Sequence, residues 1–192
     1  MKDLVSTERL NFRRYGKGME DIALCSYPEG FSDERIKVIK SSRRPYKFMK
    51  ISLNSLNEEV VFGTRYCLTL DLRPYIRSGR LVFLIKSDRP GIYMDDFTIF
   101  LKASKGENHT NSLVYSLSLA VDRQWQEISV PFKEFAYMDR QNVISSYLDF
   151  PGEVREALFM INKEDLRSLR NCDLFIGDLK ITDGQNVIYE LF

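Results

Sequence analysis

Residues 66–72 read YCLTLDL, residues 79–86 read GRLVFLIK, and residues 96–102 read DFTIFLK. Apolar residues recur at every second position of these runs, which is the period of a β-strand with one buried side. The runs are separated by Arg73-Pro74 and Pro90-Gly91, which are turn-forming pairs. Strand-like runs joined by short connections predict an antiparallel sheet.

The alternation assigns the side chains of these runs to two faces. The apolar side chains on one face are predicted to form a shared core. They are Tyr66, Leu68, Leu70, Leu72, Leu81, Phe83, Ile85, Phe97, Ile99, Leu101 and Ala103. The reverse face is mixed, with Cys67, Thr69, Asp71, Val82, Leu84, Lys86, Thr98, Phe100 and Lys102. We expect this second face either to be covered by other segments or to be a concave binding surface.

The rest of the chain continues the strand pattern. In residues 113–121 the apolar side alternates with Ser116, Ser118 and Ala120, small side chains that permit close approach. Residues 151–156 are expected to start a short helical turn, and residues 163–170 to form a short helix or loop. The sequence therefore predicts an all-β protein, an antiparallel β-sandwich or jelly roll of about ten strands. We expect a single domain over 1–192, with 1–20 as a loose arm.

Charge and cysteine content exclude several classes of protein. Twenty-eight basic and 27 acidic residues nearly cancel, so nucleic acid is not an expected partner. The pairs at 13–14 and 43–44 are locally basic; we interpret them first as solvated surface and second as a polyanion site. Three widely spaced cysteines favour a reducing compartment. No apolar run is long enough for a membrane span. We expect a cytoplasmic location if Met1 is the natural start, and otherwise a fragment of a longer protein.

Catalytic signatures are missing from the sequence. His109 is the single histidine and lies in a polar stretch, and no Gly-x-Ser-x-Gly motif surrounds a serine. Asp95 and Asp96 are adjacent, and consecutive strand residues point to opposite faces, so they make a poor acid/base pair. We therefore expect a protein without enzymatic activity, with a jelly-roll hydrolase or lyase as a remote alternative.

Three motifs resemble strands of the galactose-binding-like jelly-roll superfamily, which includes many carbohydrate-binding modules. They are LDLRPY at 70–75 followed by GxLxFxI at 79–85, WxxIxVPFxxF at 125–135, and FIGDLxI at 175–181. The resemblance covers roughly residues 46–189. It implies a non-catalytic module that binds a polysaccharide, attached to or partnered with a glycan-active enzyme. The same scaffold also serves protein assembly, so a protein-interaction domain with a protein partner is the alternative.

A glycan ligand needs aromatic faces for the C–H side of a sugar ring and polar groups for its hydroxyls. The candidate ligand-binding residues combine the two types near loops or on the mixed face. They are Asp71, Lys86, Asp88, Tyr93, Phe100, Lys102, Tyr137 and Tyr147. Each of the aromatic residues has an alternative role in the core or as a loop anchor.

Two further positions have roles implied by the resemblance. Trp125 matches a packing tryptophan, so it belongs either to the core or to a ligand contact. Asp178 matches the position of a structural calcium ion, for which Glu20 and Asp21 are candidate partners. Calcium prefers six to eight oxygen ligands, and no Asp-x-Asp loop supplies them here. We otherwise expect no cofactor.

Overall fold

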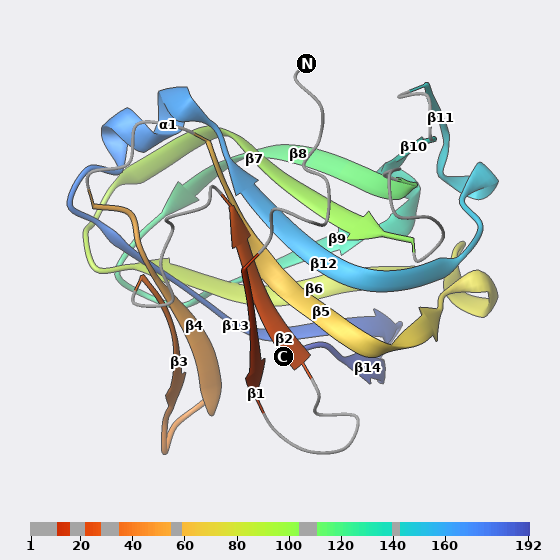
Figure 1. The fold of residues 1–192 in the computed structure, drawn as a ribbon, viewed down its shortest axis with the longest axis horizontal. Helices are drawn as coiled ribbons and strands as arrows, with labels where there is room; N and C mark the ends of the chain where they lie inside the picture. The colour runs from red at the N-terminus through yellow and green to blue at the C-terminus, as the bar shows by residue number, and fades with distance from the viewer. Residues whose placement is uncertain (1–10, 16–21, 28–34, 55–58, 104–110, 140–142) are drawn as a thin grey trace.

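The computed structural model describes residues 11–15, 22–27, 35–54, 59–103, 111–139 and 143–192. These residues form a β-sandwich of two antiparallel sheets, as expected from the sequence (Figure 1). His109, Glu20 and Asp21 lie outside the described residues. The single domain over 1–192 and the loose arm at 1–20 stay predictions.

The larger sheet has eight strands in the order β1-β2-β5-β12-β7-β8-β10-β11. Their bounds are β1 (Asn11–Tyr15), β2 (Ile22–Tyr27), β5 (Val60–Asp71), β12 (Glu153–Ile161), β7 (Ile92–Lys102), β8 (Ser112–Val121), β10 (Ala136–Met138) and β11 (Ile144–Ser146). Backbone pairing on both sides of β5, β12 and β7 places these long strands at the centre of the sheet.

The smaller sheet has six strands, in the order β3-β4-β13-β6-β9 with β14 paired to β13. Their bounds are β3 (Ile36–Lys40), β4 (Lys47–Ser52), β13 (Asp173–Asp183), β6 (Gly79–Ser87), β9 (Gln126–Pro131) and β14 (Asn186–Glu190). The short helices are η2 (Arg73–Tyr75), η3 (Phe132–Glu134), η4 (Tyr147–Asp149) and α1 (Lys163–Ser168). None of the helices in the described ranges is long and apolar enough to cross a membrane.

The core fills the space between the two sheets and confirms the apolar face predicted from the sequence, except for Leu68, whose side chain is outside the described ones. Phe83 of the six-stranded sheet contacts the rings of Phe97 and Phe159 of the eight-stranded sheet, at centroid distances of 6.4 and 5.2 Å. All three side chains are fully buried. Aromatic rings bury large areas, so this cluster is a main source of the hydrophobic free energy that joins the sheets.

The helical turn expected at 151–156 is wrong, because Glu153 begins strand β12. This strand lies between β5 and β7, and its backbone groups pair with both neighbours. Pairing on two sides satisfies the backbone more completely than one isolated helical turn does. Gly152, with φ of +83°, provides the turn that precedes the strand.

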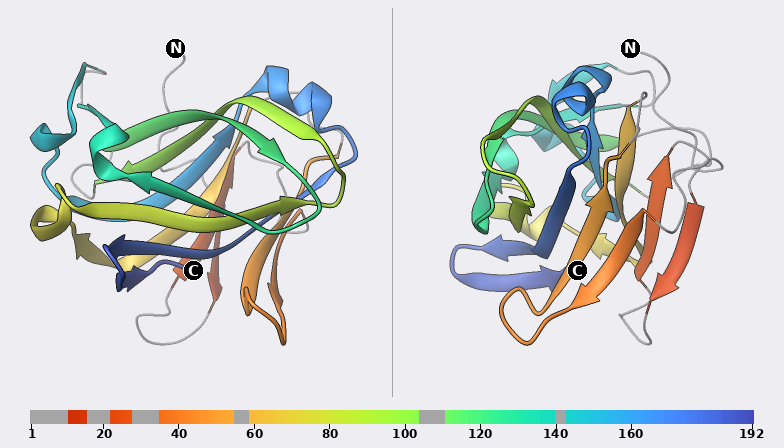
Figure 2. Two further views of the ribbon diagram at one scale, coloured as in Figure 1. Left: turned by 180° about the vertical axis from the view of Figure 1, so that it is seen from behind. Right: turned by 90° about the vertical axis from the view of Figure 1, so that its left-hand side faces the viewer.

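The single mixed face expected from the sequence is also wrong. Strands β6 and β7 follow one another in the chain but belong to different sheets, as the views in Figure 2 show. Lys86 points outward from the six-stranded sheet, since its neighbour Ile85 is in the core. Phe100 and Lys102 point outward from the eight-stranded sheet, since Leu101 is in the core. The predicted residues therefore lie on opposite outer faces of the sandwich.

Candidate carbohydrate-binding site

A β-bulge in β7 decides which side chains reach the outer face of the eight-stranded sheet. Met94 and Phe97 are both fully buried in the core, although residues three apart in a regular strand point to opposite sides. The pairing of β7 with β8 shifts between these two residues, and a bulge reverses the alternation in this way. As a result, Tyr93 before the bulge and Thr98 after it both point outward.

The helix α1 holds this bulge in place through Asp165. The Asp165 carboxylate accepts hydrogen bonds from the backbone amides of Asp95 and Asp96, at 2.9 and 3.1 Å. Asn162 caps the helix by accepting a bond of 2.8 Å from the amide of Asp165. Asp165 is buried, so these charge-assisted bonds fix the strand where a regular ladder is interrupted.

Hydroxyl groups next to the bulge form a directed chain of hydrogen bonds. Thr98 Oγ1 donates to Asp96 Oδ1 at 3.0 Å and also contacts Ser116 Oγ at 2.7 Å. Because a hydroxyl has one proton to donate, Ser116 must be the donor in the second bond. The lone pairs of the exposed Ser116 hydroxyl then face solvent, where a sugar hydroxyl can donate to them. Ser118 donates to the carbonyl of Asp95 at 3.0 Å.

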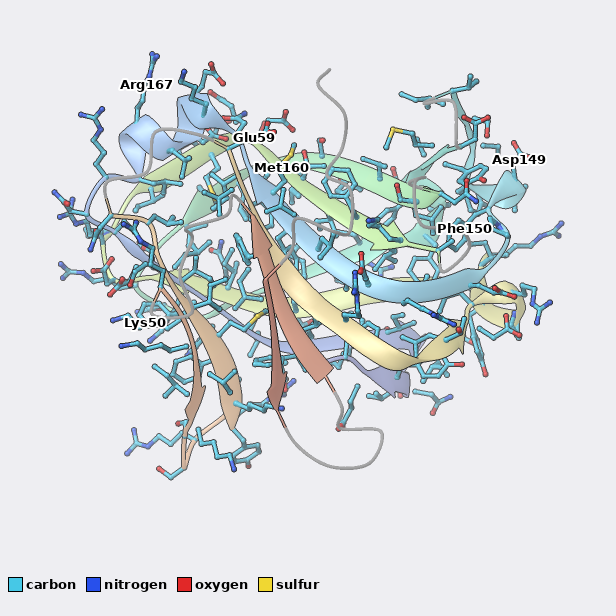
Figure 3. The ribbon with its side chains drawn as sticks, viewed as in Figure 1. Lys50, Glu59, Asp149, Phe150, Met160 and Arg167 are labelled. Atoms are coloured by element: carbon cyan, nitrogen blue, oxygen red, sulfur yellow. The ribbon has the colours of Figure 1, made fainter. Side chains whose placement is uncertain are left out.

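We define the β7 surface by Tyr93, Asp96, Thr98, Ser116 and Ser118. Tyr93, Ser116 and Ser118 are exposed, Asp96 is partly buried, and Thr98 is buried beneath its hydrogen-bond partners. The Tyr93 side chain is 52% exposed and is the neighbour of the exposed Ala120 on β8. The floor along β8 is formed by small side chains, as the sequence predicted. Met160, labelled on β12 in Figure 3, is the cross-strand neighbour of Thr98 on the other side.

A charged network lies farther along the same outer face. Glu156 of β12 is paired with Arg65 of β5 and with Lys102 of β7, on the two neighbouring strands. The Lys102 Nζ–Glu156 Oε2 distance is 3.2 Å, yet the same oxygen makes no hydrogen bond to any described residue. The contact is therefore an electrostatic ion pair and not a directed hydrogen bond. Glu156 and Lys102 are 4% and 8% exposed, so the pair is largely removed from water.

Between the charged network and the β7 surface lies a small apolar cluster. Phe100 packs there with Val61, Met138 and Leu158, and all four are at most 4% exposed. Phe100 and Lys102, two of the candidate ligand-binding residues, thus point to the same side of β7 as Tyr93. They are buried, whereas Tyr93 is exposed.

The outer face of the six-stranded sheet carries a second group of aromatic residues. The ring of Trp125 contacts the rings of Phe48 and Phe175, at 5.5 and 6.5 Å between centroids. Lys86 Nζ lies 4.9 Å from the Trp125 centroid and 5.0 Å from that of Phe175, within cation–π range. We call these four residues the aromatic surface. Trp125 is therefore outside the main core, in a packed group of half-buried rings.

Two acidic candidates are engaged by neighbouring protein groups. Asp71 accepts bonds of 2.8 and 2.7 Å from the Arg73 guanidinium and one of 3.0 Å from its backbone amide. The side-chain bonds from Arg73 lower the pKa of Asp71 below its usual value. Asp88 accepts a bond of 2.9 Å from the backbone amide of Asp173. Both carboxylates therefore stabilise loop ends of the sandwich.

Two aromatic candidates face inward rather than toward solvent. Tyr137 and Tyr147 are partly buried and pack against the main core. Tyr137 contacts the ring of Phe150 at 5.8 Å and donates a bond of 3.2 Å to Asn111 Oδ1. These contacts match the alternative role as core or loop anchors.

The calcium position has a cationic environment. Asp178 lies 2.6 Å from Arg44 and 3.6 Å from Lys180. Among the described residues no group of three or more His, Cys, Asp or Glu side chains is arranged to hold a metal ion. Two neighbouring cations disfavour a divalent cation at Asp178.

Sequence reasoning did not identify Arg65 and Glu156 as members of the outer face, and it named Ser116 only as a small side chain that permits close approach. Glu156 carried a signal, because it is the one acidic residue of the largely apolar run at 154–161. An acidic residue within such a strand needs a buried partner, and the partners come from strands that are distant in sequence.

Comparison with known proteins agrees with this architecture. The family described as carbohydrate binding domain 30 matches residues 35–183 of the chain. The chain belongs to this family. Non-catalytic carbohydrate binding, the first function expected from the sequence, is thereby confirmed. The matched range includes most of both sheets and both outer faces.

Solved structures share the fold at low sequence identity. The family 30 carbohydrate-binding module of the cellulosomal cellulase Cel9D-Cel44B of Clostridium thermocellum superposes with a TM-score of 0.55. It is 19% identical, over 93% of this chain and 98% of that one. A second family 30 module gives a TM-score of 0.53 at 17% identity, over 81% and 77% of the two chains. No curated protein matches this chain.

Proposed function

We propose that this module binds a neutral glucan chain along the β7 surface. The observation that carries the proposal is the bulge in β7, which brings the exposed Tyr93 ring and the hydroxyl chain of Thr98 and Ser116 to one side of the sheet. Tyr93 offers a ring face to the C–H side of a sugar, and Asp96 and Ser116 offer acceptors to its hydroxyls. The floor of small side chains along β8 leaves room for a polymer.

The choice of a neutral glucan has two supports. One of the similar structures is a module of a cellulase, an enzyme class that acts on a β-linked glucan. The second support is the charge balance of the β7 surface, which contains one carboxylate and no basic side chain. A protein partner, the alternative expected from the sequence, has no support in the described contacts and stays a prediction.

Affinity electrophoresis in gels containing hydroxyethyl cellulose or mixed-linkage β-glucan tests the proposal. We expect retardation of the wild-type protein and at least a tenfold loss of affinity in Tyr93→Ala, the equivalent of about 1.4 kcal/mol. Ser116→Ala should weaken binding less, because one hydrogen bond of several is lost.

Tyr46→Ala is the matched control, since Tyr46 is 67% exposed in the turn between β3 and β4 of the other sheet. It should bind neutral glucan as the wild type does, and melting curves should show all variants folded. Unchanged affinity in folded Tyr93→Ala would rule out the β7 surface as the binding site.

A further inference from the structure

The hairpin of β3 and β4 has a local positive charge that the net charge of the whole chain does not reveal. Residues 35–54 contain seven basic residues and no acidic residue. The basic residues are Arg35, Lys37, Lys40, Arg43, Arg44, Lys47 and Lys50. Because the chain holds 28 basic and 27 acidic residues, 21 basic and 27 acidic residues remain elsewhere. The near-zero net charge is thus the sum of a basic hairpin and an acidic remainder, and a local field persists at the hairpin.

Strand register places part of this charge in one row with the aromatic surface. Lys37 is opposite Lys50, Lys50 is opposite Phe175, and Phe175 is opposite Lys86. Trp125 directly precedes β9 and continues the row, because Lys86 lies over its ring. Neighbouring strands are about 4.8 Å apart, so the row crosses the sheet over roughly 19 Å. Cations and rings share this line on the outer face of the six-stranded sheet.

Several of the hairpin cations are available to a ligand. Arg44 is bound to Asp178 at 2.6 Å, and Lys50 is bound to Asp173 at 2.7 Å. The side chains of Lys37, Lys40 and Arg43 are exposed, and none forms an ion pair with a described residue. The hairpin extends beyond the rest of its sheet at the lower left of Figure 1.

We propose that the hairpin and the aromatic surface together form a second binding surface, whose ligand is an acidic polysaccharide. A chain of uronic acids lying along the row presents carboxylates to Lys37 and Lys86, and Arg43 adds positive charge from the turn between β3 and β4. Lys86 lies over the rings of Phe175 and Trp125, so the C–H faces of the sugars contact the exposed parts of these half-buried rings beside the ammonium group. The rings favour a sugar chain over a simple polyanion. The inference is independent of the β7 surface, which lies on the opposite side of the sandwich.

Affinity electrophoresis in gels containing polygalacturonate, with the full chain, tests this inference. The wild type should be retarded, and retardation should decrease with sodium chloride, because salt screens exposed charges. Lys37→Glu combined with Arg43→Glu should reduce affinity at least tenfold. The matched control is Arg77→Glu combined with Lys133→Glu, which makes the same charge change at exposed sites away from the hairpin and should retain binding.

Mixed-linkage β-glucan and duplex DNA complete the experiment. The hairpin variant should bind β-glucan normally, whereas Tyr93→Ala should bind polygalacturonate normally. Equal loss in the hairpin and control variants would overturn the inference, and so would retardation by DNA as strong as that by polygalacturonate. Loss of polygalacturonate binding in Tyr93→Ala would also overturn it, by placing both ligands at the β7 surface.

Discussion

The two outer faces of the sandwich use charged side chains in opposite ways. On the eight-stranded sheet, Glu156 is held between Arg65 and Lys102 and is almost completely buried. On the six-stranded sheet, the Lys50–Asp173 pair keeps 32% and 20% of its side chains exposed. The same kind of ion pair therefore stabilises structure on one face and remains accessible on the other.

The aromatic residues of the two faces differ in the same respect. Tyr93 stands exposed beside small side chains, and Phe100 on the same strand is enclosed. Trp125, Phe48 and Phe175 instead pack against one another edge to face, under Lys86. An exposed ring favours a ligand contact, whereas packed rings contribute first to stability. Experiments that separate stability from binding should therefore distinguish the faces.

The largest effect on stability is expected for Glu156→Gln. The amide keeps the shape but loses the charge, which leaves Lys102 buried beside a neutral group. We expect a loss of about 3 kcal/mol in the free energy of unfolding, measured by urea denaturation. Glu127→Gln, at an exposed position of β9, is the control and should change stability little. If both variants unfold at the same urea concentration, Glu156 contributes no more to stability than an exposed glutamate, and the proposed difference between the two faces is wrong.

A smaller effect is expected for Trp125→Ala. The side chain is half-buried, so we expect a loss of about 2 kcal/mol in unfolding free energy, less than for a fully buried tryptophan. Neutral-glucan affinity should stay unchanged, which is the reverse of the result expected for Tyr93→Ala. A folded Trp125→Ala protein of normal stability that no longer binds β-glucan would move the neutral-glucan site to the six-stranded sheet.

The smallest effect is expected for Lys50→Met, which removes the ion pair with Asp173 and keeps the apolar stem. Partly exposed pairs contribute less than about 1 kcal/mol. The difference in urea midpoint from the wild type should shrink further in about 1 M sodium chloride. A loss as large as that of Glu156→Gln would show that both faces are equally desolvated.

The strand pattern alone predicted the fold class and, for the runs at 79–86 and 96–102, the side of the strand that faces the core. Leu81, Phe83 and Ile85 are buried as expected, because alternation depends only on local backbone geometry. The small outward residues of β8 were recognised for the same reason. The prediction of one mixed face failed because alternation separates inside from outside but does not say which sheet a strand joins.

The candidate site depended on tertiary contacts that no local pattern encodes. The side on which Tyr93 lies follows from a bulge fixed by Asp165, about 70 residues later in the chain. Glu156 finds its partners on strands β5 and β7, which precede it by many residues. The basic residues of the hairpin can be recognised in the sequence, but their alignment with Phe175 and Trp125 depends on the register of four strand pairs.

The sequence by itself determined a β-sandwich with an apolar interior, because side-chain alternation and turn residues act locally. The tertiary structure decided which outward residues share a face, because strand order, register and bulges result from pairing between distant segments. In this protein strand pairing places Lys86 on one outer face and Phe100 and Lys102 on the other. The one binding face expected from the sequence is thereby divided into two surfaces with different chemistry.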